Sequence, residues 1–234
     1  TIVLVDVDPT KTMRNVDPTA VIMNNDIDGV AAAFVTGTST RSAWVNVSSV
    51  NTTVRDRLRV GEKSKRGIAL VEAIEEHWPA DGTIVCDMSV CGYWTGVYAE
   101  QPRPRRIVYP VGWGTLGFGL PAAIGPAAIG QRTLAVCGDG GVAFALGELA
   151  TIVQENLPYT LLIVDDGGYG MLRYDQQVMG HPERGVDLVS PEWAILAQSF
   201  GLSFTETTIE DLGDALDLKQ PGIILIRETL YPPK

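Results

Sequence analysis

Two short apolar runs, each ended abruptly by an acidic, glycine-rich turn, constrain the fold of this chain more than any other feature. Residues 133–137 lead into Gly138-Asp139-Gly140-Gly141, and residues 160–164 lead into Asp165-Asp166-Gly167-Gly168-Tyr169-Gly170. The segment between them, residues 142–155, predicts one helix. Strand, turn, helix and strand of this length form a βαβ unit whose strands are parallel. Asp139 and Asp166 are therefore expected to face one crevice at the carboxyl edge of a sheet, where open α/β sheets bind ligands.

The composition of these turns indicates what the crevice binds. Glycines at 138, 140 and 141 let the backbone approach a ligand closely, and a helix that begins there points its positive end at the same spot. This arrangement suits a phosphate, but a carboxylate beside it would repel the phosphate unless a hard cation lies between them. Mg²⁺ typically binds one or two carboxylates together with phosphate oxygens and water. A lone Gly-Asp-Gly is usually only a tight turn, whereas two such turns closing two strands favour a metal-bridged diphosphate.

The rest of the sequence extends the same pattern. Further strands are predicted at residues 83–86, 106–109, 202–205 and 222–227, and further helices at residues 68–74, 191–200 and 209–218. The run at 222–227 is apolar up to its closing Arg227, as expected for a strand covered on both faces. Six strands interleaved with helices predict an α/β fold, a three-layer α/β/α domain with a mainly parallel sheet.

Four separated phrases resemble a known family in order and spacing. They are Gly112-Trp-Gly-Thr-Leu-Gly-Phe-Gly-Leu-Pro-Ala-Ala-Ile-Gly125, Gly138-Asp139-Gly140, Gly147-Glu-Leu-Ala-Thr151 and Gly167-Gly-Tyr-Gly-Met-Leu-Arg173. Together they resemble the diphosphate-binding domain of thiamine-diphosphate enzymes, in the branch of acetolactate synthase and benzoylformate decarboxylase. The resemblance covers roughly residues 66–230.

The resemblance implies a role for each matching position. Asp139, Asp166 and the Gly168 carbonyl would bind Mg²⁺. Leu116 would wedge between the two rings of thiamine diphosphate and enforce its bent shape, and the Gly114 carbonyl would accept a hydrogen bond from the pyrimidine amino group. The remaining cofactor contacts implied are Val90, Cys91, Gly138, Gly140, Gly141, Tyr169, Gly170 and Met171.

One position departs from the family pattern. The family usually has Asn where Asp166 stands, and often at Asp165 too. An aspartate adds a full negative charge near the diphosphate, which Mg²⁺ can offset. We therefore expect a sharper Mg²⁺ dependence than an Asn version would show.

The resemblance also implies that this chain is part of a larger enzyme. Residues 1–36 resemble the tail of the central domain that precedes the diphosphate domain, residues 37–65 are expected to be a linker, and residues 66–234 form the thiamine-diphosphate-binding domain. The family's catalytic glutamate lies on a pyrimidine-binding domain, supplied by another chain or by a missing amino-terminal part. A homodimer or tetramer that decarboxylates or carboligates a small-molecule 2-oxo acid is implied, and this chain alone should bind the cofactor weakly and turn over nothing.

Composition narrows the possible partners and location. The chain carries 28 Asp and Glu against 18 Lys and Arg, for a net charge of −10, which argues against nucleic-acid binding. Residues 107–131 lack charge but contain too many glycines and prolines for a membrane span. Three cysteines in or near apolar strands are expected to be buried thiols of a reduced, cytoplasmic protein. His181 is expected on a mobile loop after the second turn, where gating of the pocket is the less favoured interpretation.

Two other functions stay open at this point. A Rossmann nucleotide-binding domain would use a Gly-x-Gly-x-x-Gly turn directly after a strand, and residues 112–117 match those letters. They follow Tyr109-Pro110, however, and are richer in glycine than such a helix start. A non-catalytic interaction module of the same fold is the other alternative.

Overall fold

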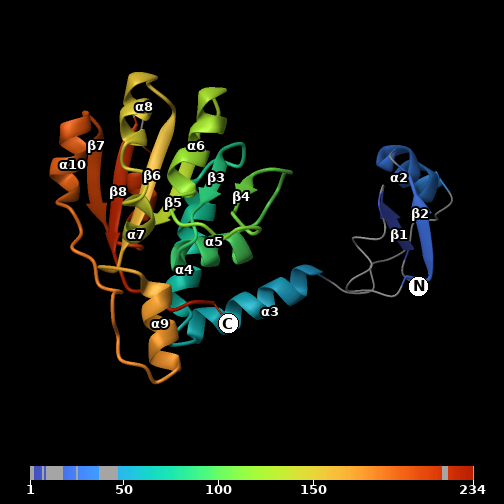
Figure 1. The fold of residues 1–234 in the computed structure, drawn as a ribbon, viewed down its shortest axis with the longest axis horizontal. Helices are drawn as coiled ribbons and strands as arrows, with labels where there is room; N and C mark the ends of the chain where they lie inside the picture. Colours follow the sequence, from blue (N-terminus) through green and yellow to red (C-terminus); the bar gives the residue numbers. More distant parts are fainter. Residues whose placement is uncertain are drawn as a thin grey trace. The chain divides into compact units, whose positions relative to one another are not determined.

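The computed structural model of the chain describes residues 3–6, 8, 18–24, 26–36, 47–217 and 221–233. The chain divides into two compact units, Thr1–Val50 and Asn51–Lys234 (Figure 1). In the first unit, strands β1 (Val3–Asp6) and β2 (Ala20–Met23) pair in parallel, and helix α2 (Ile27–Thr36) follows them.

Helix α3 (Val47–Val60) occupies much of the segment that was expected to be a linker. Its Arg55 is buried, and the guanidinium donates to a Glu75 carboxylate oxygen at 2.7 Å and to the Tyr98 carbonyl at 2.7 Å. These bonds attach α3 to the two helices that follow it. The second compact unit accordingly begins at Asn51, before residue 66. The buried Arg55 belongs to this unit because its hydrogen bonds are made to Glu75 and Tyr98.

The second unit is built on a six-stranded sheet whose neighbouring strands all pair in parallel. The strand order is β4-β3-β5-β6-β8-β7. The strands are β3 (Thr83–Cys86), β4 (Ile107–Val108), β5 (Thr133–Gly138), β6 (Tyr159–Asp165), β7 (Ser203–Thr207) and β8 (Gly222–Arg227). The predicted α/β class and parallel sheet are confirmed.

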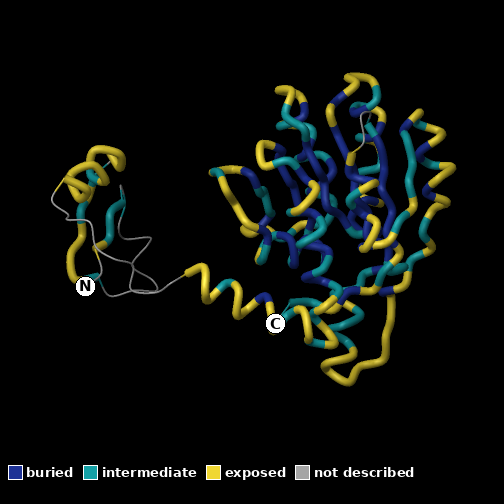
Figure 2. The backbone as a smooth tube through the Cα atoms, turned by 180° about the vertical axis from the view of Figure 1, so that it is seen from behind, coloured by how far each residue is buried: buried dark blue, intermediate teal, exposed yellow. Residues whose placement is uncertain are grey.

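Alternation along the strands creates two cores, one on each face of the sheet. In β5, Leu134 and Val136 pack into one cluster, whereas Ala135 and Cys137 pack into the other. Successive side chains of a strand point to opposite faces, so a strand that is apolar at every position must be covered on both. Figure 2 shows the result as a continuous buried interior along the central strands.

Helices cover both faces and complete the three layers (Figure 1). One core receives apolar residues of α4 (Lys65–His77), α5 (Val90–Tyr98) and α11 (Leu212–Leu216). The other receives those of α6 (Gly119–Ala128), α8 (Glu148–Gln154) and α10 (Trp193–Phe200). Among these side chains, Trp94 and Trp193 are almost fully buried, one in each core. Both tryptophans serve packing, as their apolar setting indicates.

The helix predicted over residues 142–155 is wrong as a single element. Helix α7 (Asp139–Val142) begins inside the acidic turn itself, and α8 begins only at Glu148. Between them the amides bond to carbonyls three residues back, as in Ala145 to Val142 at 3.0 Å and Glu148 to Ala145 at 3.0 Å. These i to i−3 hydrogen bonds replace the i to i−4 bonds of an α-helix between α7 and α8. The spacing of apolar residues did not reveal this break.

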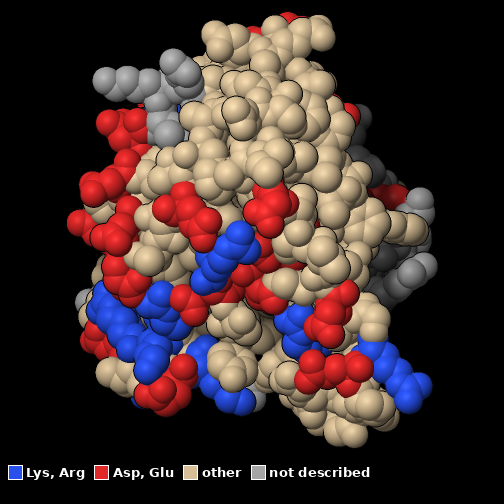
Figure 3. Space-filling view, turned by 90° about the vertical axis from the view of Figure 1, so that its left-hand side faces the viewer, with Lys and Arg blue, Asp and Glu red and all other residues tan. Residues whose placement is uncertain are grey.

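The remaining differences are in element length. Strand β4 has two residues, α10 begins at Trp193 rather than at residue 191, and α11 begins at Leu212 rather than at residue 209. Leu218, the predicted end of that last helix, lies outside the described residues. Within the described part of the chain, no helix combines the length and apolarity needed to cross a bilayer. On the face shown in Figure 3, acidic and basic side chains are intermixed, without a continuous basic stripe.

Candidate functional site

The two acidic turns leave neighbouring strands at the same edge of the sheet, as predicted. Strands β5 and β6 pair in parallel with Gly138 opposite Val164. Asp139 starts α7 directly after β5, and Asp166 follows the last residue of β6. Helix α9 (Gly170–Val178) then begins four residues after Asp166. The βαβ topology thus brings both carboxylates to one crevice.

A pocket with a volume of about 310 Å³ lies at these turns. Every site residue expected from the sequence lines it: Val90, Cys91, Gly114, Leu116, Gly138, Asp139, Gly140, Gly141, Asp166, Gly168, Tyr169, Gly170 and Met171. The structure therefore brings the whole predicted set together, although the role of each residue stays a prediction. The pocket also includes Met88 and Ser89, which precede Val90 in the same loop, and five residues that the sequence did not single out for the site, namely Tyr93, Val164, Leu172, Glu228 and Leu230.

Glycines keep the backbone of both turns bare and close together. A Cβ at Gly140 would lie 2.8 Å from the Tyr169 ring and 3.2 Å from the Gly168 carbonyl oxygen. A Cβ at Gly170 would collide with the Asp166 carboxylate. A side chain at Gly140 would therefore push the two turns apart, and one at Gly170 would displace Asp166 within its own turn, which is why the motif uses glycine there.

The Asp139 carboxyl lies in a crowded negative environment. The residue is 4% exposed. Burial, followed by the charges of Asp165 and Asp166, raises the pKa of Asp139 to about 6, and the backbone amides of Gly140 and Asp166 only partly offset this. A bound cation would relieve both the desolvation and the repulsion.

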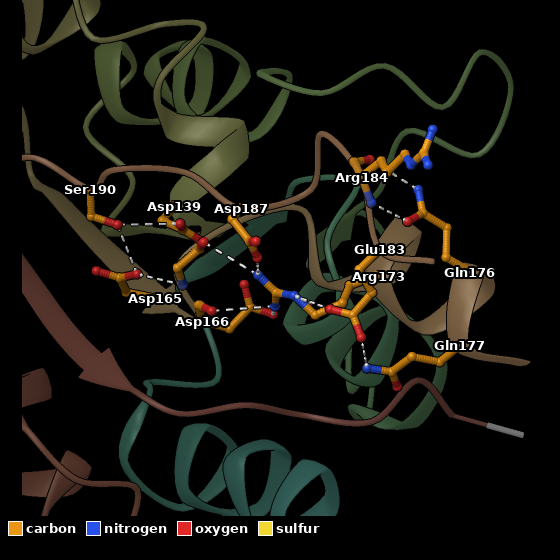
Figure 4. Close-up of polar contacts among 11 residues, drawn as sticks. Asp139, Asp165, Asp166, Arg173, Gln176, Gln177, Glu183, Arg184, Asp187 and Ser190 are labelled. Atoms are coloured by element: carbon orange, nitrogen blue, oxygen red, sulfur yellow. Dashed lines mark hydrogen bonds and ion pairs between the residues drawn. The ribbon is translucent and has the colours of Figure 1, made fainter. Parts of the chain in front are cut away.

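Asp165 is a structural member of the second turn. One carboxylate oxygen accepts from the Ser190 hydroxyl at 3.0 Å, and the other accepts from Trp193 Nε1 at 2.8 Å and from Arg227 at 3.1 Å. The side chain lies beside Asp139 and Ser190 in Figure 4, and Ser190 also reaches Asp139 at 3.4 Å. With its oxygens committed in this way, Asp165 leaves Asp166 as the carboxylate that lines the pocket.

Arg173 compensates the charge of Asp166 from the first turns of α9 (Figure 4). Its guanidinium lies 3.8 Å from an Asp166 carboxylate oxygen and 3.0 Å from Asp187, and it donates to the Gly167 carbonyl at 3.3 Å. Burial raises the pKa of Asp166, whereas Arg173 lowers it in part. The extra charge that Asp166 brings, relative to an asparagine, thus has a partner within the protein.

The segment after α9 is bonded to the second turn along its length. The Tyr169 amide donates to the Val186 carbonyl at 2.7 Å, and the Leu188 amide donates to Gly167 at 2.9 Å. The Arg184 amide bonds Gln176 at 2.8 Å, as Figure 4 shows. His181 is exposed and is not among the pocket-lining residues, so its position gives no support to a gating role.

Asp87 is a buried residue next to the pocket that sequence reasoning missed. It comes directly after strand β3, as Asp139 comes directly after β5 and Asp166 directly after β6. This shared position was the available signal in the sequence. Its carboxylate accepts hydrogen bonds from the amides of Gly117 and Phe118, directly after Leu116. Asp87 itself is absent from the pocket lining.

The donor set limits which metal the pocket could bind. Among the described residues, no group of three or more His, Cys, Asp or Glu side chains is arranged to hold an ion. Asp139 and Asp166 are only two carboxylates, so a cation here would need carbonyl, ligand and water oxygens as well. Mg²⁺, which favours few protein ligands and shares phosphate oxygens, suits such a set.

Fold and site together define a class: a doubly covered parallel α/β domain with an acidic, glycine-lined ligand pocket at its carboxyl edge. Residues 87–226 match the family described as "Thiamine pyrophosphate enzyme, C-terminal TPP binding domain". Because the match spans more than half of the chain, the protein belongs to this family.

Relatives of this chain bear the names of synthases and decarboxylases. It is 36% identical over 168 residues to a probable 2-ketoarginine decarboxylase, AruI, of Pseudomonas aeruginosa, covering 68% of this chain and 29% of that protein. It is 29% identical over 150 residues to the acetolactate synthase isozyme 2 large subunit of Escherichia coli, covering 62% of this chain and 27% of that protein. A third, the acetolactate synthase large subunit of Lactococcus lactis, is 24% identical over 221 residues, which is 83% of this chain and 38% of the relative. The chain thus spans well under half the length of these relatives.

Proposed function

We propose that this chain binds the diphosphate of thiamine diphosphate through Mg²⁺, as the carboxyl-terminal part of an enzyme that decarboxylates or carboligates 2-oxo acids. One observation carries the proposal: Asp139 and Asp166, from turns after adjacent parallel strands, line the same glycine-walled pocket. The family membership supports the cofactor.

The residues present fit a magnesium-bound diphosphate. Two carboxylates and the Gly168 carbonyl are the proposed protein ligands, and diphosphate oxygens and water would complete the octahedron. The raised pKa of Asp139 supports this assignment, since it reflects burial and then the neighbouring negative charges, both of which a dication would offset. Glycine at Gly140, Gly168 and Gly170 lets the turns pack closely against Tyr169, Val186 and Asp166, and glycine-rich turns at helix starts present amide N–H groups to an anion.

The chain's own contribution is anchoring and shaping. The thiazolium ring of the cofactor supplies the electron sink that a 2-oxo acid needs in order to lose CO₂. We assign to the two turns the task of holding the diphosphate, and to Leu116 and the Gly114 carbonyl that of orienting the rings. Val90, Cys91 and Met171 would line the wall beside the ligand. Their common position in the pocket supports this assignment.

The complete enzyme needs more than this chain. The catalytic glutamate and a pyrimidine-binding domain would come from another polypeptide or another part of the protein, and a homodimer or tetramer would bring them to the pocket. The choice between pyruvate and larger 2-oxo acids would depend partly on that domain. The three cysteines are buried and free, which suits a reducing cytoplasm.

The alternatives have weaker support. In the Gly112-to-Gly117 segment, Gly114 and Gly117 both have positive φ and α6 begins only at Gly119, so the segment is not a strand-to-helix dinucleotide turn. A non-catalytic module of the same fold would keep the pocket without binding the cofactor.

Calorimetry tests the proposal and separates these readings. A preparation containing this chain and the domain with the glutamate is titrated with thiamine diphosphate, with and without Mg²⁺, and with a nicotinamide dinucleotide. We expect Mg²⁺-dependent binding of thiamine diphosphate and CO₂ release from a panel of 2-oxo acids. Binding of the dinucleotide instead, or of neither ligand, would overturn the proposal.

A further inference from the structure

Asp87 is a fully buried carboxylate that forms no ion pair with any Lys, Arg or His of the described residues. A charge removed from water is costly unless hydrogen bonds replace its hydration. Here three backbone amides do so: Met88 at 2.8 Å, Gly117 at 3.1 Å and Phe118 at 3.1 Å. Each amide bonded to an ionised acceptor contributes more than a neutral hydrogen bond, so these contacts fix the loops that supply them.

The carboxylate lies where three loops of the pocket wall converge. Met88 opens the loop after β3, and Gly117 follows the loop that carries Gly114 and Leu116. The third loop is the acidic turn after β5, since a Cβ added at Gly141 would collide with the Asp87 Oδ2 atom. All three loops line the pocket, whereas Asp87 lies behind them.

The two carboxylate oxygens have separate tasks. Oδ1 accepts from Met88 and Phe118, and Oδ2 accepts from Gly117 alone. The Gly117 amide belongs to the rigid peptide plane that begins at Leu116, so the bond to Oδ2 sets the direction in which Leu116 leaves its loop. Gly117 itself adopts a positive φ of 77° and lies against Phe144.

We infer that Asp87 is a positioning residue that aims Leu116 and Gly114 at the rings of the cofactor, while the acidic turns hold its diphosphate. This inference rests on the proposed function, because it assumes that the pocket binds thiamine diphosphate. It assigns ring binding and diphosphate binding to supports that can be disturbed separately.

The substitution Asp87→Asn isolates the contact to Gly117. Asparagine has one acceptor oxygen and an NH₂ donor. With its oxygen at the Oδ1 position it keeps Met88 and Phe118, and its NH₂ then faces the Gly117 amide, donor against donor. The damage is thus confined to the peptide after Leu116.

The test uses the chain together with the domain that carries the glutamate and two probes, magnesium pyrophosphate and magnesium thiamine diphosphate, each titrated by calorimetry. Pyrophosphate reports the acidic turns alone, whereas thiamine diphosphate also reports the ring-facing loop. We expect Asp87→Asn to weaken thiamine diphosphate about tenfold, the scale of one lost charge-assisted bond, and to change pyrophosphate affinity by less than about threefold.

The control is Thr133→Val, which removes a buried hydroxyl that donates to Gln131 at 2.9 Å. Thr133 is the first residue of β5, at the end of the strand opposite the turn. A loss of stability alone would lower both affinities together, so this variant should leave their ratio unchanged. A ratio that shifts equally in both variants would contradict a positioning role.

Amide hydrogen exchange of the unliganded chain tests the contact without any ligand. In Asp87→Asn, the Gly117 amide should exchange at least tenfold faster while the Met88 and Phe118 amides stay protected. Unchanged exchange at Gly117 would overturn the inference whatever the affinities are. If the unaltered chain binds neither probe in the presence of the domain that carries the glutamate, the proposed function fails, and the exchange result still decides whether Asp87 fixes the loop.

Discussion

The turns after β5 and β6 share an acidic, glycine-rich pattern, yet the protein supports them differently. The turn after β5 has one carboxylate, Asp139, whose side chain is contacted by the Ser190 hydroxyl at 3.4 Å and has no ion-pair partner in the described part of the chain. The turn after β6 has two carboxylates, Asp165 and Asp166, and each has different partners. Asp165 is bonded to Trp193 and Arg227, and Asp166 faces Arg173.

This difference indicates how a protein keeps three carboxylates beside one pocket. Buried like charges repel unless each is paired or neutralised. Two of the three obtain protein partners, and Asp139 is left with backbone amides and a raised pKa. An external cation would therefore offset more uncompensated negative charge at Asp139 than at the other two carboxylates. The carboxylates of the turn after β6 already have partners within the protein.

The largest expected effect is on metal-dependent binding. Asp139→Asn removes the carboxylate that lacks a protein cation, so thiamine diphosphate affinity at limiting Mg²⁺ should fall more than about a hundredfold, beyond the 10–100-fold typical of supporting residues. Asp166→Asn should cost far less, because Arg173 already neutralises that charge, but should flatten the Mg²⁺ dependence. Calorimetry across a Mg²⁺ titration measures both. Equal losses in the two variants would remove the proposed division of roles.

The second prediction concerns pH in the absence of Mg²⁺. The folded pKa of Asp139 is about 6, against an ordinary value of 3.8. Between these values the folded state retains a proton that the unfolded state has lost, so stability falls as pH rises through this window. Asp139→Asn lacks this loss and should gain stability relative to the unaltered chain between about pH 4 and 6, by at most about 3 kcal/mol. Urea unfolding at several pH values measures the difference, and parallel pH curves for the two proteins would contradict it.

A third prediction tests the structural role of the turn after β6. Trp193→Phe removes the donor to Asp165 and part of a 1% exposed side chain, so the free energy of unfolding should fall by about 2 kcal/mol or more. Trp113→Phe, at a side chain that is 91% exposed, is the matched control and should change it by less than about 0.5 kcal/mol. Chemical denaturation of both variants gives the comparison, and similar values would show that Asp165 does not depend on Trp193.

The smallest effect is expected at Arg173. Its ion pair with Asp166 spans 3.8 Å and is partly exposed, so Arg173→Gln should lower stability by about 0.5–1 kcal/mol. The loss should shrink in an Asp166→Asn background, as a double-mutant cycle measures. Arg184→Gln, on the exposed segment nearby, controls for loss of charge alone. A cycle with no coupling would mean that Arg173 serves Asp187 and not Asp166.

Much of this fold could be predicted because its signals are local and repeated. Residues 161–164 and 223–226 are apolar at every position, which indicates strands covered on both faces, and the structure buries all of them. The acidic turns were predictable for the same reason, since Asp and Gly follow each apolar run at once. Parallel pairing then placed Asp139 and Asp166 at one edge without further information.

What could not be predicted depends on contacts between residues far apart in sequence. Arg55 lies in the segment that was expected to be a linker, and its hydrogen bonds to Glu75 and Tyr98 attach helix α3 to the helices that follow. The partners of Asp165 lie at Ser190, Trp193 and Arg227, and no local pattern joins them. Asp87 bonds amides thirty residues away, Gly117 among them. Only the folded chain reveals which of several strand-ending aspartates faces the pocket and which supports its wall.

The most direct test of the central claim is the anomalous diffraction of Mn²⁺, used in place of Mg²⁺, in crystals of the chain grown with thiamine diphosphate. We predict a single peak within coordination distance of Asp139, Asp166 and the Gly168 carbonyl, with the diphosphate bound to the same ion. A peak that contacts only one of these turns, or a diphosphate bound with no metal beside Asp139, would contradict the account.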